Sequence, residues 1–253
     1  MSRNKTTRLR RILAELEQRP SLRVNELALR LAVSAETVRR DLEDLAVEGL
    51  VDRTYGGAMR RRSLEPSVSE RHNIRVAERE AIARRACPLL AGSTHLLIGS
   101  GATTVQVARR IAIELNHVTV ITHAFGVATV LSLNPTISVL IAPGLYHAGE
   151  GAMHGSATVR FLERYKVDWA VLGASGLTAE GPSDALIDAA EVYATMVARA
   201  GRTMLVADGT KFGRTFPARW ADWQNIAVLA TDTVPSGELH AALRAAGVCI
   251  QTD

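Results

Sequence analysis

The chain has 253 residues, of which 47% are hydrophobic and 22% charged, and its formal net charge is +4. This composition is typical of a globular protein with one large domain or two of ordinary size, and it excludes a disordered chain and a collagen-like repeat. No run approaches the roughly 18 apolar residues of a membrane span, and the arginine-rich start lacks the apolar core of a signal peptide, so we expect a cytoplasmic protein with no membrane partner.

The positive charge is concentrated at the start of the chain. Residues 1–62 contain 14 Lys and Arg against 9 Asp and Glu, whereas residues 63–253 contain 16 against 17. Because attraction to phosphate is needed only where nucleic acid is contacted, this partition indicates a small nucleic-acid-binding module joined to a near-neutral domain.

Three apolar stripes at helical spacing open the chain. The first lies between Thr6 and Glu17 and predicts a helix that ends before Pro20. The other two are formed by Leu27, Ala28 and Leu31, and then by Val38, Leu42 and Leu45. Only a short turn separates these two stripes, so their helices must pack across it, as in a helix-turn-helix.

The second helix of this pair has a defined start. Ser34 is a good N-cap for a helix that begins at Ala35, and Glu36 suits its positively charged first turn. With the apolar stripe turned inward, Arg39 and Arg40 lie on or near the outer face, where they can read guanine or contact backbone phosphate in a major groove. A simpler interpretation is an exposed helix with a Glu36–Arg40 ion pair, which contributes about 0.2 to 0.5 kcal/mol.

A strand and a turn follow this helix. Residues 50–54 suit a short strand, and Gly56 and Gly57 permit a turn with positive φ, which is typical of the wing of a winged helix-turn-helix. Residues 60–62 are arginines, which can neutralise DNA phosphate or belong to a solvated linker. The DNA contacts that we expect lie on the recognition helix, its cap and the wing: Ser34, Glu36, Thr37, Arg39, Arg40, Arg53, Tyr55 and Arg60.

The domain boundary is expected within residues 58–70, which lack periodicity and contain Arg, Ser and Pro. We therefore divide the chain into a DNA-binding domain at 1–60, a linker at 61–76 and a second domain at 77–253, with polar helix-forming sequence from about Ser69 to Leu90.

In the second domain, short apolar runs alternate with helical stretches. The runs lie at 95–99, 118–122, 138–142, 168–172, 203–207 and 226–230, and the helices at 104–115, 125–133, 186–200 and 236–246. This alternation predicts an α/β domain with a largely parallel sheet.

Small and hydroxyl-bearing residues follow several of these strands. In parallel α/β sheets, ligands bind beyond the carboxyl ends of the strands, where loops enter helices. The loops at 99–104, 122–124, 143–144, 173–176 and 208–211 are therefore candidates, although each can also be an ordinary tight turn. Hydroxyls at Ser100, Thr103 and Thr104 and the charge of Lys211 suit a phosphorylated metabolite.

No cofactor or metal is expected. The glycines at 99 and 101 lack the third glycine of a dinucleotide fingerprint. Cys87 and Cys249 have no metal-like or redox-like spacing, and the cluster of His147, Glu150 and His154 matches no zinc motif.

The chain resembles the DeoR family of bacterial transcriptional repressors along nearly its full length. In the first domain the resemblance rests on Val24, Glu26-Leu27-Ala28, Leu31, Val33-Ser34, Thr37-Val38-Arg39-Arg40-Asp41-Leu42, Leu45, Gly49-Leu50, Arg53 and Gly56-Gly57-Ala58, with Tyr55 where histidine is common. In the second it rests on the sequences at 100–104, 120–122, 173–177 and 207–213 and on Asp168. The resemblance implies an α/β sensor domain related in fold to ribose-phosphate isomerases, glucosamine-phosphate deaminases and CoA transferases.

The resemblance also implies a sugar phosphate or related effector. Gly99 stands where the family usually has aspartate, His123 where it has asparagine, Pro143 where it has the first of two glycines, and Tyr193 where a lysine is often found. His123 titrates near neutral pH and could donate to an anion in partial compensation. The effector-binding residues that we expect are Ser100, Gly101, Thr103, Thr104, His123, Gly144, Ser175, Gly176 and Lys211.

These features predict a repressor of a carbohydrate-metabolism operon that is not an enzyme. It would bind double-stranded operator DNA as a homo-oligomer, a dimer or a tetramer, and leave it when a phosphorylated sugar binds. Two alternatives remain. The sensor could keep isomerase, deaminase or CoA-transfer activity, with Glu150, Asp184, Asp188 and Lys211 as its plausible carriers, or the protein could be an activator with no small-molecule effector.

Overall fold

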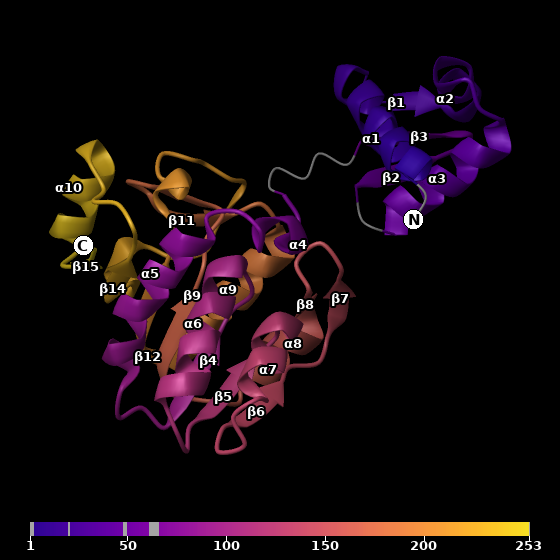
Figure 1. Ribbon diagram of the computed structural model, residues 1–253. Helices are drawn as coiled ribbons and strands as arrows, with labels where there is room; N and C mark the ends of the chain where they lie inside the picture. Colours follow the sequence, from indigo (N-terminus) through magenta and orange to yellow (C-terminus); the bar gives the residue numbers. More distant parts are fainter. Residues whose placement is uncertain (1–2, 20, 48–49, 61–65, 253) are drawn as a thin grey trace. The chain divides into compact units, whose positions relative to one another are not determined.

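The computed structural model describes residues 3–19, 21–47, 50–60 and 66–252 (Figure 1). The chain divides into two compact units, Met1–Ser63 and Leu64–Asp253. Within the described residues, no helix is both long and apolar enough to cross a membrane.

The first unit is a three-helix module with a three-stranded antiparallel sheet. Its elements are α1 (Arg3–Gln18), β1 (Ser21–Arg23), α2 (Val24–Leu31), α3 (Ala35–Val47), β2 (Val51–Thr54) and β3 (Gly57–Arg60). The apolar stripes of the three helices form one core, in which Ile12, Leu27 and Leu42 are fully buried. The expected helices, strand and turn are therefore present, and they make a winged helix-turn-helix.

The sequence did not predict β1. It pairs with β3, so the sheet has the order β1-β3-β2. Only Leu22 of this strand is buried, and three residues are too few for an alternating pattern to be recognised.

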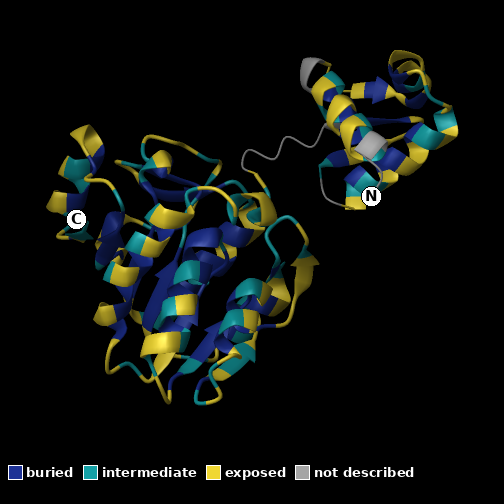
Figure 2. Ribbon diagram, viewed as in Figure 1, coloured by how far each residue is buried: buried dark blue, intermediate teal, exposed yellow. Residues whose placement is uncertain are grey.

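The second unit is a three-layer α/β/α sandwich. Seven parallel strands form its sheet in the order β15 (Cys249–Gln251), β14 (Val228–Ala230), β12 (Ala200–Val206), β9 (Val167–Leu172), β4 (His95–Ile98), β5 (Thr119–Thr122) and β6 (Ser138–Ile141). One face is covered by α5 (Val76–Ala86), α6 (Ala102–Glu114) and α7 (Phe125–Leu131). The other is covered by α8 (Ser156–Leu162), α9 (Ile187–Arg199) and α10 (Gly237–Ala245). The central strands are buried while the helices keep exposed outer surfaces (Figure 2).

The strand order reverses between β4 and β9. From β4 the chain adds β5 and β6 on one side, and it then returns to place β9, β12, β14 and β15 on the other. The loops that leave adjacent strands therefore diverge here, which opens a crevice at the carboxyl ends of β4 and β9.

The segment before α5 differs from the expectation of a linker at 61–76 and a continuous helix from about Ser69 to Leu90. Its described part contains α4 (Val68–Arg71), and the chain turns at Arg75, whose φ is +52°, before α5 begins. The 3-10 helix η1 (Cys87–Leu90) follows α5. Arg79 of α5 donates hydrogen bonds to the carbonyl oxygens of Arg71 and Ile74 and to Asp208 beyond β12, so side-chain contacts override the helix-forming tendency of this sequence.

Several short elements were also absent from the sequence prediction. They are the hairpin of β7 (Leu145–His147) and β8 (Ala152–His154), the small sheet of β10 (Gly176–Thr178), β11 (Gly181–Asp184) and β13 (Ala218–Arg219), and the 3-10 helices η2 (Gly209–Lys211) and η3 (Trp223–Asn225). Each is four residues or shorter, so hydrophobic periodicity cannot reveal it.

A buried carboxylate of α3 forms an ion pair with α1 inside the first unit. Asp41 of α3 is buried, and it accepts two hydrogen bonds from Arg8 of α1, with Nη2 and Oδ1 2.9 Å apart. The Asp41 side chain is 2% exposed and that of Arg8 is 22% exposed.

We expect Asp41→Ala to destabilise the first unit by on the order of 2 kcal/mol, because it leaves a partly buried guanidinium without its carboxylate. Glu43→Ala, at an exposed position of the same helix, is the matched control. Hydrogen exchange of the intact chain, followed by mass spectrometry, should show faster exchange in α1 and α3 for Asp41→Ala alone. Equal exchange in the two variants would mean that the pair contributes no stability.

Candidate functional site

The start of α3 is fixed by its cap. Ser34 Oγ accepts a hydrogen bond from the Thr37 amide at 3.1 Å, as an N-cap does. Val38 and Leu42 are fully buried, whereas Arg39 and Arg40 are exposed. Helix α3 therefore presents a basic surface near its N-terminus and an apolar face to the core.

Glu36 pairs with both of these arginines. It lies 3.4 Å from Arg39 Nη1 and 3.5 Å from Arg40 Nε, and the three side chains are 56 to 77% exposed. Ion pairs this exposed contribute little, so either arginine can exchange Glu36 for a phosphate or a base edge at small cost. The ion pair of the simpler interpretation is thus present, but it leaves the basic surface accessible.

The wing is held close to this surface. Arg53 of β2 donates from Nη1 to the Arg39 carbonyl oxygen at 3.3 Å, and Tyr55 is fully exposed at the turn. Gly57 is required where β3 meets β1, because an added Cβ would lie 2.3 Å from the Leu22 oxygen. Arg60 ends β3, but its side chain lies outside the described structure, as do Gly49, Arg61 and Arg62.

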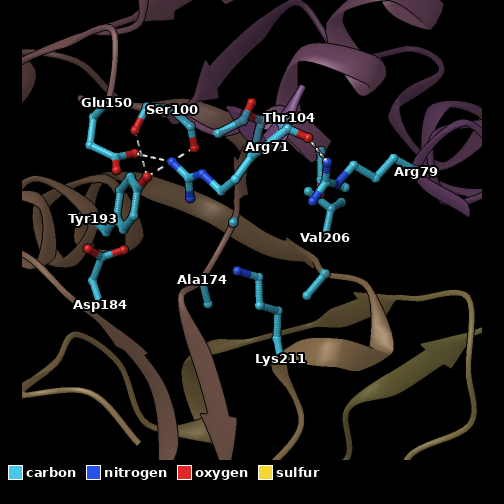
Figure 3. Close-up of a pocket in the computed structure, with 15 residues that line it drawn as sticks. Arg71, Arg79, Ser100, Thr104, Glu150, Ala174, Asp184, Tyr193, Val206 and Lys211 are labelled. Carbon is cyan, nitrogen blue, oxygen red and sulfur yellow. Dashed lines mark hydrogen bonds and ion pairs between the residues drawn. The ribbon is translucent and has the colours of Figure 1, made fainter. Parts of the chain in front are cut away.

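A pocket in the second unit opens at the crevice between β4 and β9. The loops after these strands contribute Ser100–Thr104 and Gly173–Ala174, and the other lining residues are Arg71, Arg79, Glu150, Asp184, Tyr193, Val206, Ala207 and Lys211 (Figure 3). It leaves about 30 Å³ for the centres of water-sized molecules, which is room for a few waters. The expected position of a ligand site and the observed pocket therefore coincide at this loop pair.

The N-terminus of α6 supplies hydrogen-bond donors to the pocket. Gly101 is the N-cap of this 13-residue helix and has a φ of +133°. The positive end of the helix dipole and the hydroxyl of Thr103 suit an anion, whereas the Ser100 hydroxyl lies 2.9 Å from that of Tyr193. Thr104 donates instead to the Gly101 oxygen at 2.9 Å, so it shapes the loop.

Charged groups of both signs line the pocket. Arg71 Nη2 lies 2.5 Å from Glu150 Oε2, and Figure 3 shows this guanidinium directed at the carboxylate while Lys211 enters from another side. Burial lowers the pKa of Lys211 to about 8, with a smaller effect from the positive charge of Arg214. Burial also raises the pKa of Asp184 to about 6 and raises that of Glu150.

The prediction that His123 titrates near neutral pH is wrong. His123 is fully buried, which lowers its pKa to about 3, with His154 as a second cause. Its Nδ1 lies 2.7 Å from the Met153 oxygen, and its Nε2 accepts from the Ser100 amide at 3.2 Å. Both ring nitrogens are thus engaged, so a neutral His123 positions the Ser100 loop and has no proton to donate to an anion.

Three other expected effector residues do not line the pocket. An added Cβ at Gly144 would lie 2.2 Å from Thr158 Oγ1, and one at Gly176 would lie 2.2 Å from the Arg214 oxygen. These glycines allow close approach of backbone segments. Ser175 is buried, and its hydroxyl donates to Asp184 Oδ2 at 3.3 Å.

The sequence missed the contribution of α4 and α5 to the pocket. Arg71 and Arg79 come from the segment before the first strand, where strand-end loops give no signal. The sequence offers Glu150 and Asp184 as carriers of catalysis, Glu150 also as part of a cluster with two histidines, and Tyr193 only as a departure from a family pattern. Among the described residues, no three His, Cys, Asp or Glu side chains are grouped to hold a metal ion.

Comparison with known proteins identifies both units. A family model for the DeoR C terminal sensor domain matches residues 74–233, and one for a DeoR-like helix-turn-helix domain matches residues 8–63. A solved ribose 5-phosphate isomerase A from Methanocaldococcus jannaschii is 19% identical, with 53% of each chain covered and a TM-score of 0.36.

Two curated relatives match nearly the whole chain. The HTH-type transcriptional repressor CsqR of Escherichia coli is 28% identical over 235 residues, which cover 92% of this chain and 90% of that protein. The glycerol-3-phosphate regulon repressor of Haemophilus influenzae is 30% identical over 237 residues, which cover 91% of this chain and 90% of that protein. The chain therefore belongs to the DeoR family of helix-turn-helix transcriptional regulators.

Proposed function

We propose that this protein represses a carbohydrate-metabolism operon by binding its operator and that a sugar phosphate releases it. The observation that carries the DNA-binding role is the exposed basic surface of Arg39 and Arg40 on a capped helix, with Arg53 beside it. Phosphate contacts by such residues hold a recognition helix in the major groove, and arginine can also read guanine there. The other proposed contacts are Ser34, Glu36, Thr37, Tyr55 and Arg60.

The pocket supports a phosphorylated effector. Ser100, Gly101 and Thr103 surround the start of α6, and Lys211 adds a positive charge. Glu150 and Asp184 supply acceptors that sugar hydroxyls can use. The name of the glycerol-3-phosphate regulon repressor, a relative that matches nearly the whole chain, supports the same class of ligand.

We infer that this pocket binds its ligand without turnover. Asp184 accepts a hydrogen bond from Ser175 and another from the Leu186 amide, and Glu150 is paired with Arg71. A general acid or base must reach the reacting proton, and the contacts of Asp184 hold its carboxyl in other interactions.

The proposed function implies a homo-oligomer in the cytoplasm. Winged helix-turn-helix modules usually bind paired half-sites, so at least a dimer is needed for a symmetric operator. Effector binding would then change the spacing of two DNA-binding units and shift the population away from the DNA-bound form.

We expect Arg39→Ala and Arg40→Ala each to weaken operator binding by about tenfold or more, because each removes a cation that contacts DNA. Gel-shift binding to DNA upstream of the gene and its neighbours, at fixed salt, measures the effect. Arg164→Ala, at an exposed position of the second unit, is the control. Undiminished binding by both variants, with their melting temperatures unchanged, would rule out α3 as the recognition helix.

Binding of the effector should weaken as the pH rises from about 7.5 to 9.5. Lys211 has a pKa of about 8 and loses its positive charge over this range, whereas a phosphate monoester is already almost fully charged at the start. Isothermal titration with the sugar phosphate that most raises the melting temperature tests this.

The variant Lys211→Met provides the comparison for this titration. It should bind more weakly at pH 7.5 and should lose most of the pH dependence. A wild-type affinity that stays constant across the same range would exclude Lys211 as a ligand for the anion.

A further inference from the structure

Helix α4 is the first described element of the sensor unit, and it is attached to the turn between β7 and β8. The Val68 amide donates to the Gly149 oxygen at 2.7 Å, and an added Cβ at Gly151 would lie 3.4 Å from Val68 Cγ1, so the two segments are in contact. Ser67 and Glu70 form a capping box that fixes the start of the helix. In sequence, α4 is separated from β3, the last strand of the DNA-binding unit, only by residues 61–67.

The side chain of Arg71 makes a second attachment to the same turn. Its Nη2 lies 2.5 Å from Glu150 Oε2, and the two side chains are 12% and 18% exposed. Both residues line the pocket (Figure 3). A charged pair this far from solvent is a strong contact only while both partners remain, and each group becomes costly when it is left alone.

The residues after Arg71 are anchored to a different part of the unit. Arg79 donates to the carbonyl oxygens of Arg71 and Ile74, and its Nη2 lies 3.3 Å from Asp208 Oδ2. Arg75 Nη2 lies 2.6 Å from Asp232 Oδ2. The backbone at Arg71 is thereby held beside the end of β12, while its side chain and the start of α4 lie on the β7–β8 turn.

The pocket has no room for a sugar phosphate while Arg71 and Glu150 are paired. Its space of about 30 Å³ compares with the several hundred Å³ of typical ligand pockets. Ligand entry must therefore displace lining side chains. An incoming phosphate carries the same charge as Glu150 and needs the same kind of partner.

We propose that Glu150 is an internal competitor for Arg71: a bound phosphate group takes the Arg71 guanidinium from Glu150 and thereby releases α4 from the β7–β8 turn. This inference rests on the proposed function and specifies how the pocket is regulated. It makes Arg71 a ligand for the effector and Glu150 a residue that sets its affinity. Because α4 is close in sequence to the DNA-binding unit, its release is the step by which effector binding in the pocket affects that unit.

The test compares phosphate binding in four variants of the full chain. Isothermal titration with inorganic phosphate near pH 7, at constant ionic strength, measures the affinity of wild type, Glu150→Gln, Asp184→Asn, Arg71→Gln and the double variant Arg71→Gln/Glu150→Gln. Asp184 is the matched control, because its carboxyl is buried and lines the same pocket. Removing either carboxyl makes the pocket more positive, but only Glu150→Gln removes the carboxylate that is ion-paired with Arg71.

We expect Glu150→Gln to tighten phosphate binding by about fivefold or more, beyond any change in Asp184→Asn. Arg71→Gln should weaken phosphate binding. When Glu150→Gln is added to Arg71→Gln, the gain in affinity should not exceed the gain that Asp184→Asn gives in the wild-type protein. If Glu150→Gln and Asp184→Asn change the phosphate affinity equally, the loss of a negative charge alone explains the effect. If Glu150→Gln gives its full gain in affinity in the Arg71→Gln background, Glu150 does not compete for Arg71. Absence of phosphate binding in all variants would also overturn the proposal.

Hydrogen exchange of the ligand-free proteins gives an independent readout. Glu150→Gln should speed exchange at the amides of α4, whereas Glu180→Gln, at an exposed turn, should not. Unchanged exchange in Glu150→Gln would contradict the release of α4. Neither measurement uses DNA, so failure of the proposed repressor function would appear separately, as absent operator binding by the wild-type protein.

Discussion

The buried guanidinium of Arg79 is the contact on which the arrangement of the pocket depends. It is 95% buried, and it joins the carbonyl oxygens of Arg71 and Ile74 to the carboxylate of Asp208 at the end of β12. Burial lowers its pKa, and the Asp208 charge opposes this effect. A buried arginine is costly unless its donors are used, so the chain before α5 is held in the one path that supplies these acceptors. That path brings Arg71 into the pocket.

Long apolar patterns made most of the architecture predictable. The stripes of α1, α2 and α3 and the alternation of strands with helices in the second unit each extend over enough residues to distinguish a period of 3.6 from a short buried strand. The short elements lack this information, since β1, β7 and β8 have three residues each. Their positions follow from contacts distant in sequence, such as the pairing of Ser21 with Met59.

The pocket was predictable where it consists of strand-end loops, and unpredictable elsewhere. Ser100, Gly101 and Thr103 follow β4 at the reversal of strand order, and Lys211 follows β12, one strand further along the same edge, so the rule for strand-end loops places them together. The role of Arg71 depends on a turn at Arg75 that no local pattern signals. The pKa of His123 depends on complete burial between Ser100 and Met153, which a sequence cannot specify.

Two departures from the family pattern, Gly99 and Tyr193, fit one another in space. An added Cβ at Gly99 would lie 2.9 Å from Tyr193 Cε1, so the tyrosine ring occupies the space that a side chain at position 99 would need. The Tyr193 hydroxyl donates to the Ser100 carbonyl oxygen at 3.0 Å and lies 2.9 Å from Ser100 Oγ.

The two departures also act together on the charge of the pocket. With Gly99 and Tyr193 in place of a carboxylate and a lysine, two opposite charges are removed together, which leaves the charge balance of the pocket unchanged. In the proposed function, recognition of an anion would then depend more on Arg71 and Lys211, and Arg71 already has a carboxylate partner in Glu150. The proposed competition between Glu150 and a bound phosphate would thus place the affinity for the effector under the control of a contact made by α4.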